Sequence, residues 1–175
     1  LSRTGFTVFA STFAPFASMR ASEQVRMNLG YMKEPLNLVA LGSGLSLGML
    51  GNSHFGLEDV AVMSSIPNLK IVCPADCVEL YKTLEASCED VSPKYIRLTG
   101  AMNTPIVYET DYDFQIGKAI WIEPAAEVNI IATGTSVGHA KTAIAELTKL
   151  GFSIGLLNMH TISPLDTGAL DEVAR

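Results

Sequence analysis

A histidine at the end of a glycine-rich segment is the first candidate for chemistry. Residues 42–54 contain four glycines and end at His54, which indicates a backbone that turns sharply or approaches a ligand closely. The segment lacks the Lys-Ser or Lys-Thr pair of a P-loop, and Gly48 follows Gly44 by four residues, which breaks the GxGxxG spacing of dinucleotide-binding folds. Imidazole titrates near neutral pH, so His54 could transfer protons; a hydrogen-bonded structural histidine is the alternative.

Two phenylalanines near the N-terminus form a second candidate. Phe13 and Phe16 lie one helical turn apart after the first predicted strand. Stacked aromatic rings gain free energy beyond the area that they bury, so the pair could form a platform for a flat heterocycle. The same spacing suits two core side chains on one face of a helix, and the spacing alone leaves both readings open.

A third candidate is a serine in a G-x-S-x-G pattern. Residues 134–138 match the nucleophile elbow of hydrolases, in which an acid and then a histidine follow the serine along the chain. Here His139 and His160 both precede the first candidate acid, Asp166, so the order is wrong for a hydrolase. We predict that Ser136 is a helix N-cap and that both histidines are structural.

Alternating strands and helices would position these residues. Apolar runs rich in Val, Ile and Leu between helical patterns predict an α/β fold with a parallel sheet flanked by helices, followed by part of a second α/β domain. We expect one domain at 1–108, an acidic linker at 109–117 and an incomplete domain at 118–175, with both ends cut from something larger. Asp76 should cap a helix and Gly151 should end one. The predicted strands are 5–10, 36–41, 69–73, 94–98, 128–133 and 152–158, and the predicted helices are 16–29, 78–87, 136–150 and one beginning near 164.

Composition excludes several classes of protein. The net charge is −6 and the 12 basic residues are scattered, which argues against binding to nucleic acid. No long apolar run is free of charges, so we expect no membrane span, and without a signal peptide the expected compartment is the cytoplasm. The three cysteines lack the paired spacing of a zinc site, so no metal ligand is expected in this chain.

Several segments together resemble the transketolase family. Residues 11–16 resemble its aromatic segment, and residues 51–54 fall where the family has a G-x-T-H loop. The block 65–76, with Ser-Ile-Pro-Asn-Leu and Pro-Ala-Asp, is the most specific portion. Residues 95–98 resemble the strand that closes the pyrimidine-binding domain, and residues 158–166 resemble the C-terminal domain. The likeness covers nearly the whole chain and implies the C-terminal subunit or portion of a thiamine-diphosphate-dependent, transketolase-like enzyme.

The resemblance implies a cofactor at a subunit interface. The aminopyrimidine of thiamine diphosphate would stack near Phe13 and Phe16, and His54 would assist by hydrogen bonding or proton transfer at the substrate oxygens. A diphosphate-binding N-terminal subunit would bind Mg2+ and the diphosphate, and a homo- or heterotetramer is the expected assembly. The glutamate that activates the cofactor in this family would lie upstream of Leu1.

Three positions depart from the family's pattern. Met49 and Leu50 stand where the loop usually carries an acidic pair, and Gly100 stands where sugar-phosphate transketolases have an arginine. These changes argue against an ordinary sugar-phosphate transketolase. The first hypothesis is an enzyme subunit that transfers a two-carbon ketol unit between carbonyl or sugar substrates. The alternatives are a non-catalytic paralogue that keeps the fold and the partner interface, and the β subunit of a 2-oxo-acid dehydrogenase.

Overall fold

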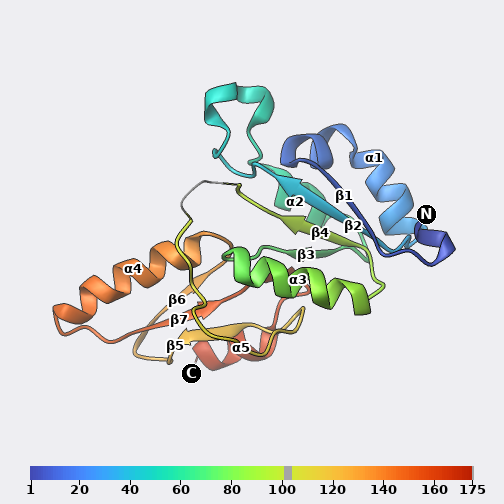
Figure 1. Ribbon diagram of the computed structural model, residues 1–175. Helices are drawn as coiled ribbons and strands as arrows, with labels where there is room; N and C mark the ends of the chain where they lie inside the picture. Colours follow the sequence, from blue (N-terminus) through green and yellow to red (C-terminus); the bar gives the residue numbers. More distant parts are fainter. Residues whose placement is uncertain (101–103, 175) are drawn as a thin grey trace.

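Two sheets organise the molecule. The computed structural model describes residues 1–100 and 104–174 (Figure 1). The first sheet has the order β1-β2-β4-β3-β8; its first four strands are parallel, and β8 pairs antiparallel with β3. This arrangement confirms the predicted α/β fold with a largely parallel sheet. Its strands are β1 (Val8–Phe13), β2 (Leu36–Leu41), β3 (Lys70–Val72), β4 (Lys94–Arg97) and β8 (Thr161–Ser163).

The first strand begins later than predicted. We expected a strand at 5–10, but Gly5 has φ 87 and closes the short helix η1 (Ser2–Thr4), so the chain is still turning there. Pairing with β2 then fixes the strand, with Val8 opposite Leu36 and Phe13 opposite Leu41. Phe13 therefore ends a strand and does not lie in the helix that follows.

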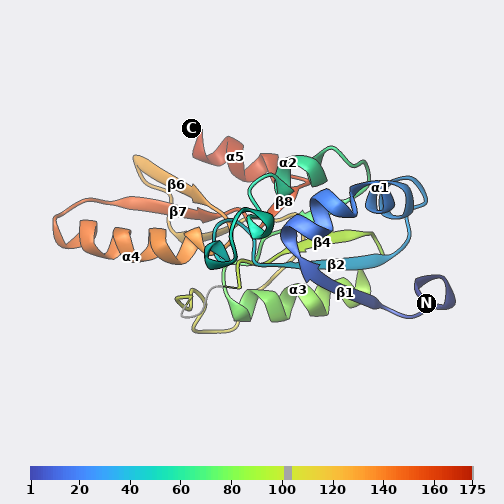
Figure 2. The same ribbon diagram turned by 90° about the horizontal axis from the view of Figure 1, so that it is seen from above.

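Helices cover both faces of the first sheet (Figure 2). On one face lie α2 (Asp59–Ser64) and a helical segment with wide π-helical turns. On the other face lies α3 (Cys77–Glu89). Asp76 caps α3 as predicted, because its carboxylate accepts a hydrogen bond from the Glu79 N–H at 2.8 Å. The π-helical segment consists of η2 (Phe16–Arg20), α1 (Ser22–Val25) and η3 (Arg26–Tyr31).

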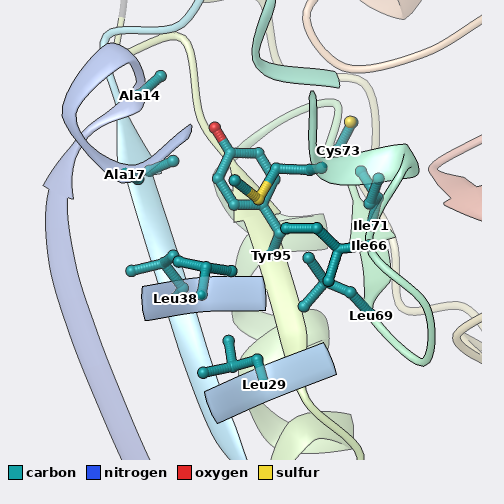
Figure 3. Packing of buried hydrophobic residues seen from close by; sticks show 12 residues of the cluster. Ala14, Ala17, Leu29, Leu38, Ile66, Leu69, Ile71, Cys73 and Tyr95 are labelled. Atoms are coloured by element: carbon teal, nitrogen blue, oxygen red, sulfur yellow. The ribbon is translucent and has the colours of Figure 1, made fainter. Parts of the chain in front are cut away.

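The core of the first unit lies between the sheet and the helices α1 and α2 (Figure 3). Ala14, Ala17 and Leu29 come from the N-terminal segment and pack on strand residues such as Leu38. Tyr95 is fully buried among them, and its hydroxyl points toward the end of the core where Ala14 lies (Figure 3). A buried hydroxyl needs a hydrogen-bond partner, and that partner belongs to the site described below.

The second sheet has the order β5-β7-β6, with β6 and β7 parallel and β5 antiparallel to β7. Gly151, with φ 88, follows the end of the helix α4 as predicted. Ser136 is not the N-cap: Thr135 occupies that position without a side-chain cap bond, and Ser136 is the first helical residue. The elements are β5 (Ile120–Glu123), β6 (Val128–Ala132), α4 (Ser136–Lys149), β7 (Ile154–Asn158) and α5 (Thr167–Val173).

None of the helices within the described residues is long and apolar enough to cross a membrane.

Candidate functional site

Three rings that the sequence singled out come together in space. Phe13 at the end of β1, Phe16 at the start of η2 and His54 in a distant loop are each half-buried. The ring centroids of the two phenylalanines are 5.8 Å apart. The His54 ring lies 5.6 Å from Phe13 and 5.2 Å from Phe16, in edge and tilted orientations. The predicted proximity of the aromatic pair and the histidine is therefore present, although Phe13 belongs to a strand.

A tight loop carries His54. Gly44, with φ 66, and Gly56 form two backbone hydrogen bonds of 2.8 and 2.9 Å that close the loop. A Cβ on Gly56 would lie 3.0 Å from the Cβ of Ala14 and 3.1 Å from the Cα of Ser43, so the close approach needs a glycine. The loop stands out from the body of the molecule between β2 and α2 (Figure 1).

The tip of this loop is apolar and solvent-exposed. It contains η4 (Gly48–Leu50) and η5 (Asn52–His54). Met49 is 90% exposed and Leu50 is 51% exposed, so neither side chain is part of the core. Nδ1 of His54 lies 3.0 Å from the Ser53 hydroxyl, and Nε2 makes no hydrogen bond within the described ranges. The ring therefore has one nitrogen left for a ligand.

An arginine that sequence reasoning missed lies beside the rings. The guanidinium carbon of Arg20 is 4.1 Å from the centroid of the Phe16 ring, within the range of a cation–π contact. No ion pair involves Arg20 in the part of the chain that the structure describes. The spacing of four residues on a helical segment was the signal available in the sequence.

An ion pair between a half-buried arginine and a buried carboxylate lies next to the loop. Arg97 on β4 donates from Nε to Oδ2 of Asp59 at 2.7 Å, and Tyr95 donates from its hydroxyl to the same oxygen at 3.0 Å. The sequence indicated only that Arg97 lies within a strand. Its partner could not be identified there, because Asp59 is distant along the chain.

A hollow of about 320 Å³ opens at the carboxyl ends of the parallel strands. Leu41, which lines the hollow, is the last residue of β2, and Thr99 and Gly100 follow the end of β4. Ligands bind at this edge in open parallel sheets, so the rings and the hollow lie at the end of the sheet where a site is expected.

A second buried polar cluster joins the two sheets. Glu79 on α3 is fully buried and accepts hydrogen bonds from Asn158 of β7 at 2.8 Å, from the Tyr108 hydroxyl at 3.2 Å and from the Ala75 N–H at 2.7 Å. Burial raises the pKa of the Glu79 carboxyl to about 7 against these hydrogen bonds. A perturbed pKa often marks a functional site, but this carboxyl is closed off from solvent, so we interpret it as structural. The cluster consists of Asp76, Glu79, Tyr108, Tyr112 and Asn158.

The other two histidines lie away from the three rings. His160 is fully buried, and its ring packs against Phe114 with centroids 4.6 Å apart. Burial lowers the pKa of His160 to about 4. His139 lies exposed on α4. In residues 1–100 and 104–174, no three His, Cys, Asp or Glu side chains lie close enough together to hold a metal ion.

Two family models match the chain. The model described as the pyrimidine binding domain of transketolase matches residues 1–103. The model described as the C-terminal domain of transketolase matches residues 117–175. The first range contains β1 to β4, and the second contains the three-stranded sheet together with β8.

Similar proteins carry related names. A Methanocaldococcus jannaschii protein named for the C-terminal section of a transketolase is 36% identical over 168 residues, covering 95% of this chain and 53% of that protein. One of the subunits of the apulose-4-phosphate transketolase of Phocaeicola vulgatus is 33% identical, covering 99% of this chain and 56% of that one. A solved structure described as a split gene transketolase, in the form of an inactive beta4 tetramer, has a TM-score of 0.88 at 32% identity, covering 99% of this chain and 56% of that chain. This chain thus spans about half the length of the curated relatives that it matches.

Proposed function

Because the chain belongs to the transketolase family, we propose that it supplies one half of a thiamine-diphosphate site in an enzyme that transfers a two-carbon ketol unit between carbonyl or sugar substrates. The chain spans about half the length of its relatives, so the activity would belong to an assembly. The relative from Phocaeicola vulgatus is named as one subunit of a transketolase, which supports a partner subunit for this chain as well.

The observation that carries the proposal is the group of three half-buried rings at the carboxyl end of the first sheet. Phe13, Phe16 and His54 lie within 5.2 to 5.8 Å of one another. The two phenylalanine rings would offer an aromatic surface to a flat heterocycle, and the imidazole would lie beside it. This surface fits the aminopyrimidine ring of the cofactor. When bound, the thiazolium ring of the cofactor supplies a sink for negative charge on the substrate carbon.

Within this site His54 would bind and protonate substrate oxygens. Nδ1 faces the Ser53 hydroxyl at 3.0 Å, which leaves Nε2 as the nitrogen that reaches a substrate. Phe13 and Phe16 would hold the ring of the cofactor and exclude water from one side of it. The exposed, apolar tip of the loop, which contains Met49, would lie over the bound substrate.

The diphosphate and Mg2+ would be bound by an N-terminal partner subunit. Residues 1–103 match the family model described as the pyrimidine binding domain, which supports a separate subunit for the diphosphate and its metal ion. A tetramer is the proposed assembly, supported by the relative whose solved structure is described as a tetramer.

A non-catalytic paralogue is the second candidate. Met49 and Leu50 place apolar side chains where the resemblance led us to expect carboxylates, and Gly100 offers no cation beside the hollow. These residues favour a chain that keeps the partner interface without the chemistry.

Calorimetric titration distinguishes the two candidates. Thiamine diphosphate with Mg2+ should bind when the partner subunit is present, and Phe16→Ala should weaken binding about fivefold, because a stacked pair contributes about 1 kcal/mol. Phe152→Ala, which changes an exposed ring in the second unit, is the matched control. Absence of binding in the complete complex would exclude the enzyme and leave the paralogue.

Turnover tests the role of the histidine. His54→Ala should lower kcat at least about tenfold while cofactor binding stays close to native, since the ring would handle protons more than it binds the cofactor. His139→Ala on the exposed face of α4 should leave kcat unchanged. Equal rates for native protein and His54→Ala would remove the proposed role.

A further inference from the structure

We infer that Asp59 is a positioning residue for His54: its buried carboxylate, held by Arg97, fixes the loop that carries the histidine against the aromatic segment. The inference rests on the proposed function, since it identifies what keeps the proposed proton-transfer group in place. Asp59 would act through the backbone and not through contact with a substrate.

The carboxylate of Asp59 is held from two directions. The residue is 1% exposed. Arg97 donates from Nε to Oδ2 at 2.7 Å and from Nη2 to Oδ1 at 3.2 Å, a bidentate contact that fixes both the position and the rotation of the carboxylate. The Tyr95 hydroxyl donates to Oδ2 at 3.0 Å. Both donors stand on β4, which lies between β2 and β3, so the anchor belongs to the rigid centre of the sheet.

The donors keep their protons near neutral pH. Burial lowers the pKa of the Arg97 guanidinium, but the hydrogen bond and the negative charge of Asp59 outweigh burial and raise that pKa above its ordinary value. Burial, followed by the charge of Asp59, raises the pKa of the Tyr95 hydroxyl. The anchor should therefore persist over the neutral range of pH.

A short series of contacts connects the anchor to the rings. Nη2 of Arg97 also lies 3.5 Å from the carbonyl oxygen of Gly56. Gly56 pairs with Gly44 through two backbone hydrogen bonds and packs so closely on Ala14 that a Cβ would approach its Cβ to 3.0 Å. Ala14 lies between the two phenylalanines in the sequence, so the loop and the aromatic segment share this contact.

Little of the loop is fully buried. Of residues 44–58, all of which the structure describes, only Gly56 is buried. At the entry to the loop, the Ser46 hydroxyl donates to the carbonyl of Thr99 at 2.5 Å. At the exit stands Asp59. Polar anchors at the two ends of the loop therefore help to determine where the histidine lies, together with the half-buried side chains of Leu47 and Phe55.

Nuclear magnetic resonance of the histidine rings tests this inference without any measurement of activity. The chain has three histidines, so each ring can be resolved and assigned. In the native protein the ring protons of His54 should be displaced by the two neighbouring phenylalanine rings. In Asp59→Asn the His54 signals should move toward the positions of an unstructured histidine, while the signals of His139 and His160 stay in place.

Asp90→Asn is the matched control. Asp90 pairs with Lys70 at 2.6 Å, near the amino ends of the strands and away from the loop, so its loss should leave the His54 signals unchanged. If Asp59→Asn does not fold, Tyr95→Phe removes one hydrogen bond to the same carboxylate and should move His54 in the same direction. Unmoved His54 signals in a folded variant would overturn the inference.

Kinetics of the assembled enzyme separate this inference from the proposed function. Asp59→Asn should lower kcat at least about tenfold with less than about a threefold change in the affinity for thiamine diphosphate, because misplacement of a reacting group costs rate more than binding. Displaced His54 signals in a complex that does not bind the cofactor would support the positioning role and reject the proposed function. Cofactor binding in a complex whose His54 signals do not move in Asp59→Asn would support the proposed function and reject the positioning role.

Discussion

Replacing Glu79 by Gln should reveal a dependence of stability on pH that the native protein conceals. Burial raises the pKa of the Glu79 carboxyl from 4.5 to about 7, although hydrogen bonds from Ala75, Asn158 and Tyr108 oppose the rise. Burial lowers the pKa of His160 from 6.5 to about 4. Both groups lie inside the protein near the contact between the two sheets, so both titrations are coupled to unfolding.

The two groups act in opposite directions. The contribution of Glu79 is full below pH 4.5 and is lost as pH rises toward about 7, because the folded state holds the proton more tightly than the unfolded state. The contribution of His160 is full above pH 6.5 and is lost as pH falls toward about 4. Each amounts to about 3.5 kcal/mol in full, at about 1.4 kcal/mol per unit of pKa. From about pH 4.5 to about 6.5 they should nearly cancel, leaving a level free energy of unfolding.

Urea unfolding over this pH range measures the effect. Glu79→Gln removes the contribution that falls with pH, so its free energy of unfolding should rise by about 2 kcal/mol from about pH 4.5 to about 6.5. His160→Gln should instead show a fall of similar size. Each substitution also changes stability by a constant amount, which leaves the slopes unaffected. A slope for Glu79→Gln equal to that of the native protein would refute the reasoning, because Glu79 would then carry no extra proton in the folded state.

Two further predictions concern packing and thiol chemistry. Gly155→Ala in β7 should lower the free energy of unfolding by at least about 2 kcal/mol, because an added Cβ would lie 2.8 Å from a backbone carbonyl oxygen. Gly48→Ala, with its nearest neighbour at 3.9 Å, should change it by less than about 1 kcal/mol in the same urea assay. A thiol reagent should modify the exposed Cys77 and Cys88 in the native protein but Cys73 only after unfolding, since burial raises the pKa of that thiol to about 12. Rapid modification of all three cysteines would contradict the buried position of Cys73.

The parallel strands could be predicted because each is a short apolar run, which can be recognised without knowing its partners in the sheet. The apolar runs at 36–41, 69–73 and 94–98 correspond closely to β2, β3 and β4. Asp76 and Gly151 were equally predictable, since the preferences for a cap and for a left-handed residue act on the nearest turn of helix.

Features that depend on distant partners could not be predicted. The start of β1 follows from its register against β2, and the short strand β8 exists because it pairs with β3. Ser136 illustrates a local preference that did not decide the outcome: a serine next to a helix start need not occupy the cap itself. The side-chain pattern also gives no indication of the wide π-helical turns of η2 and η3, because it shows only that the segment is helical.

The residues of the candidate site also include some that the sequence could indicate and some that it could not. Phe13, Phe16 and His54 were chosen by residue type and local spacing, and the structure brings them together. Asp59 and Arg97 were not identified as a pair, because nothing in either segment indicates which charge the other meets across the sheet.

The antiparallel strand β8 has a consequence for proteolysis. It forms the outer edge of the first sheet, yet it comes from the far end of the chain, after β5, β6 and β7. A single cut in the predicted linker at 109–117 would therefore leave two fragments that stay associated through main-chain hydrogen bonds. If the fragments were separated, β3 would present bare N–H and C=O groups to solvent, and such an edge recruits strands from other molecules.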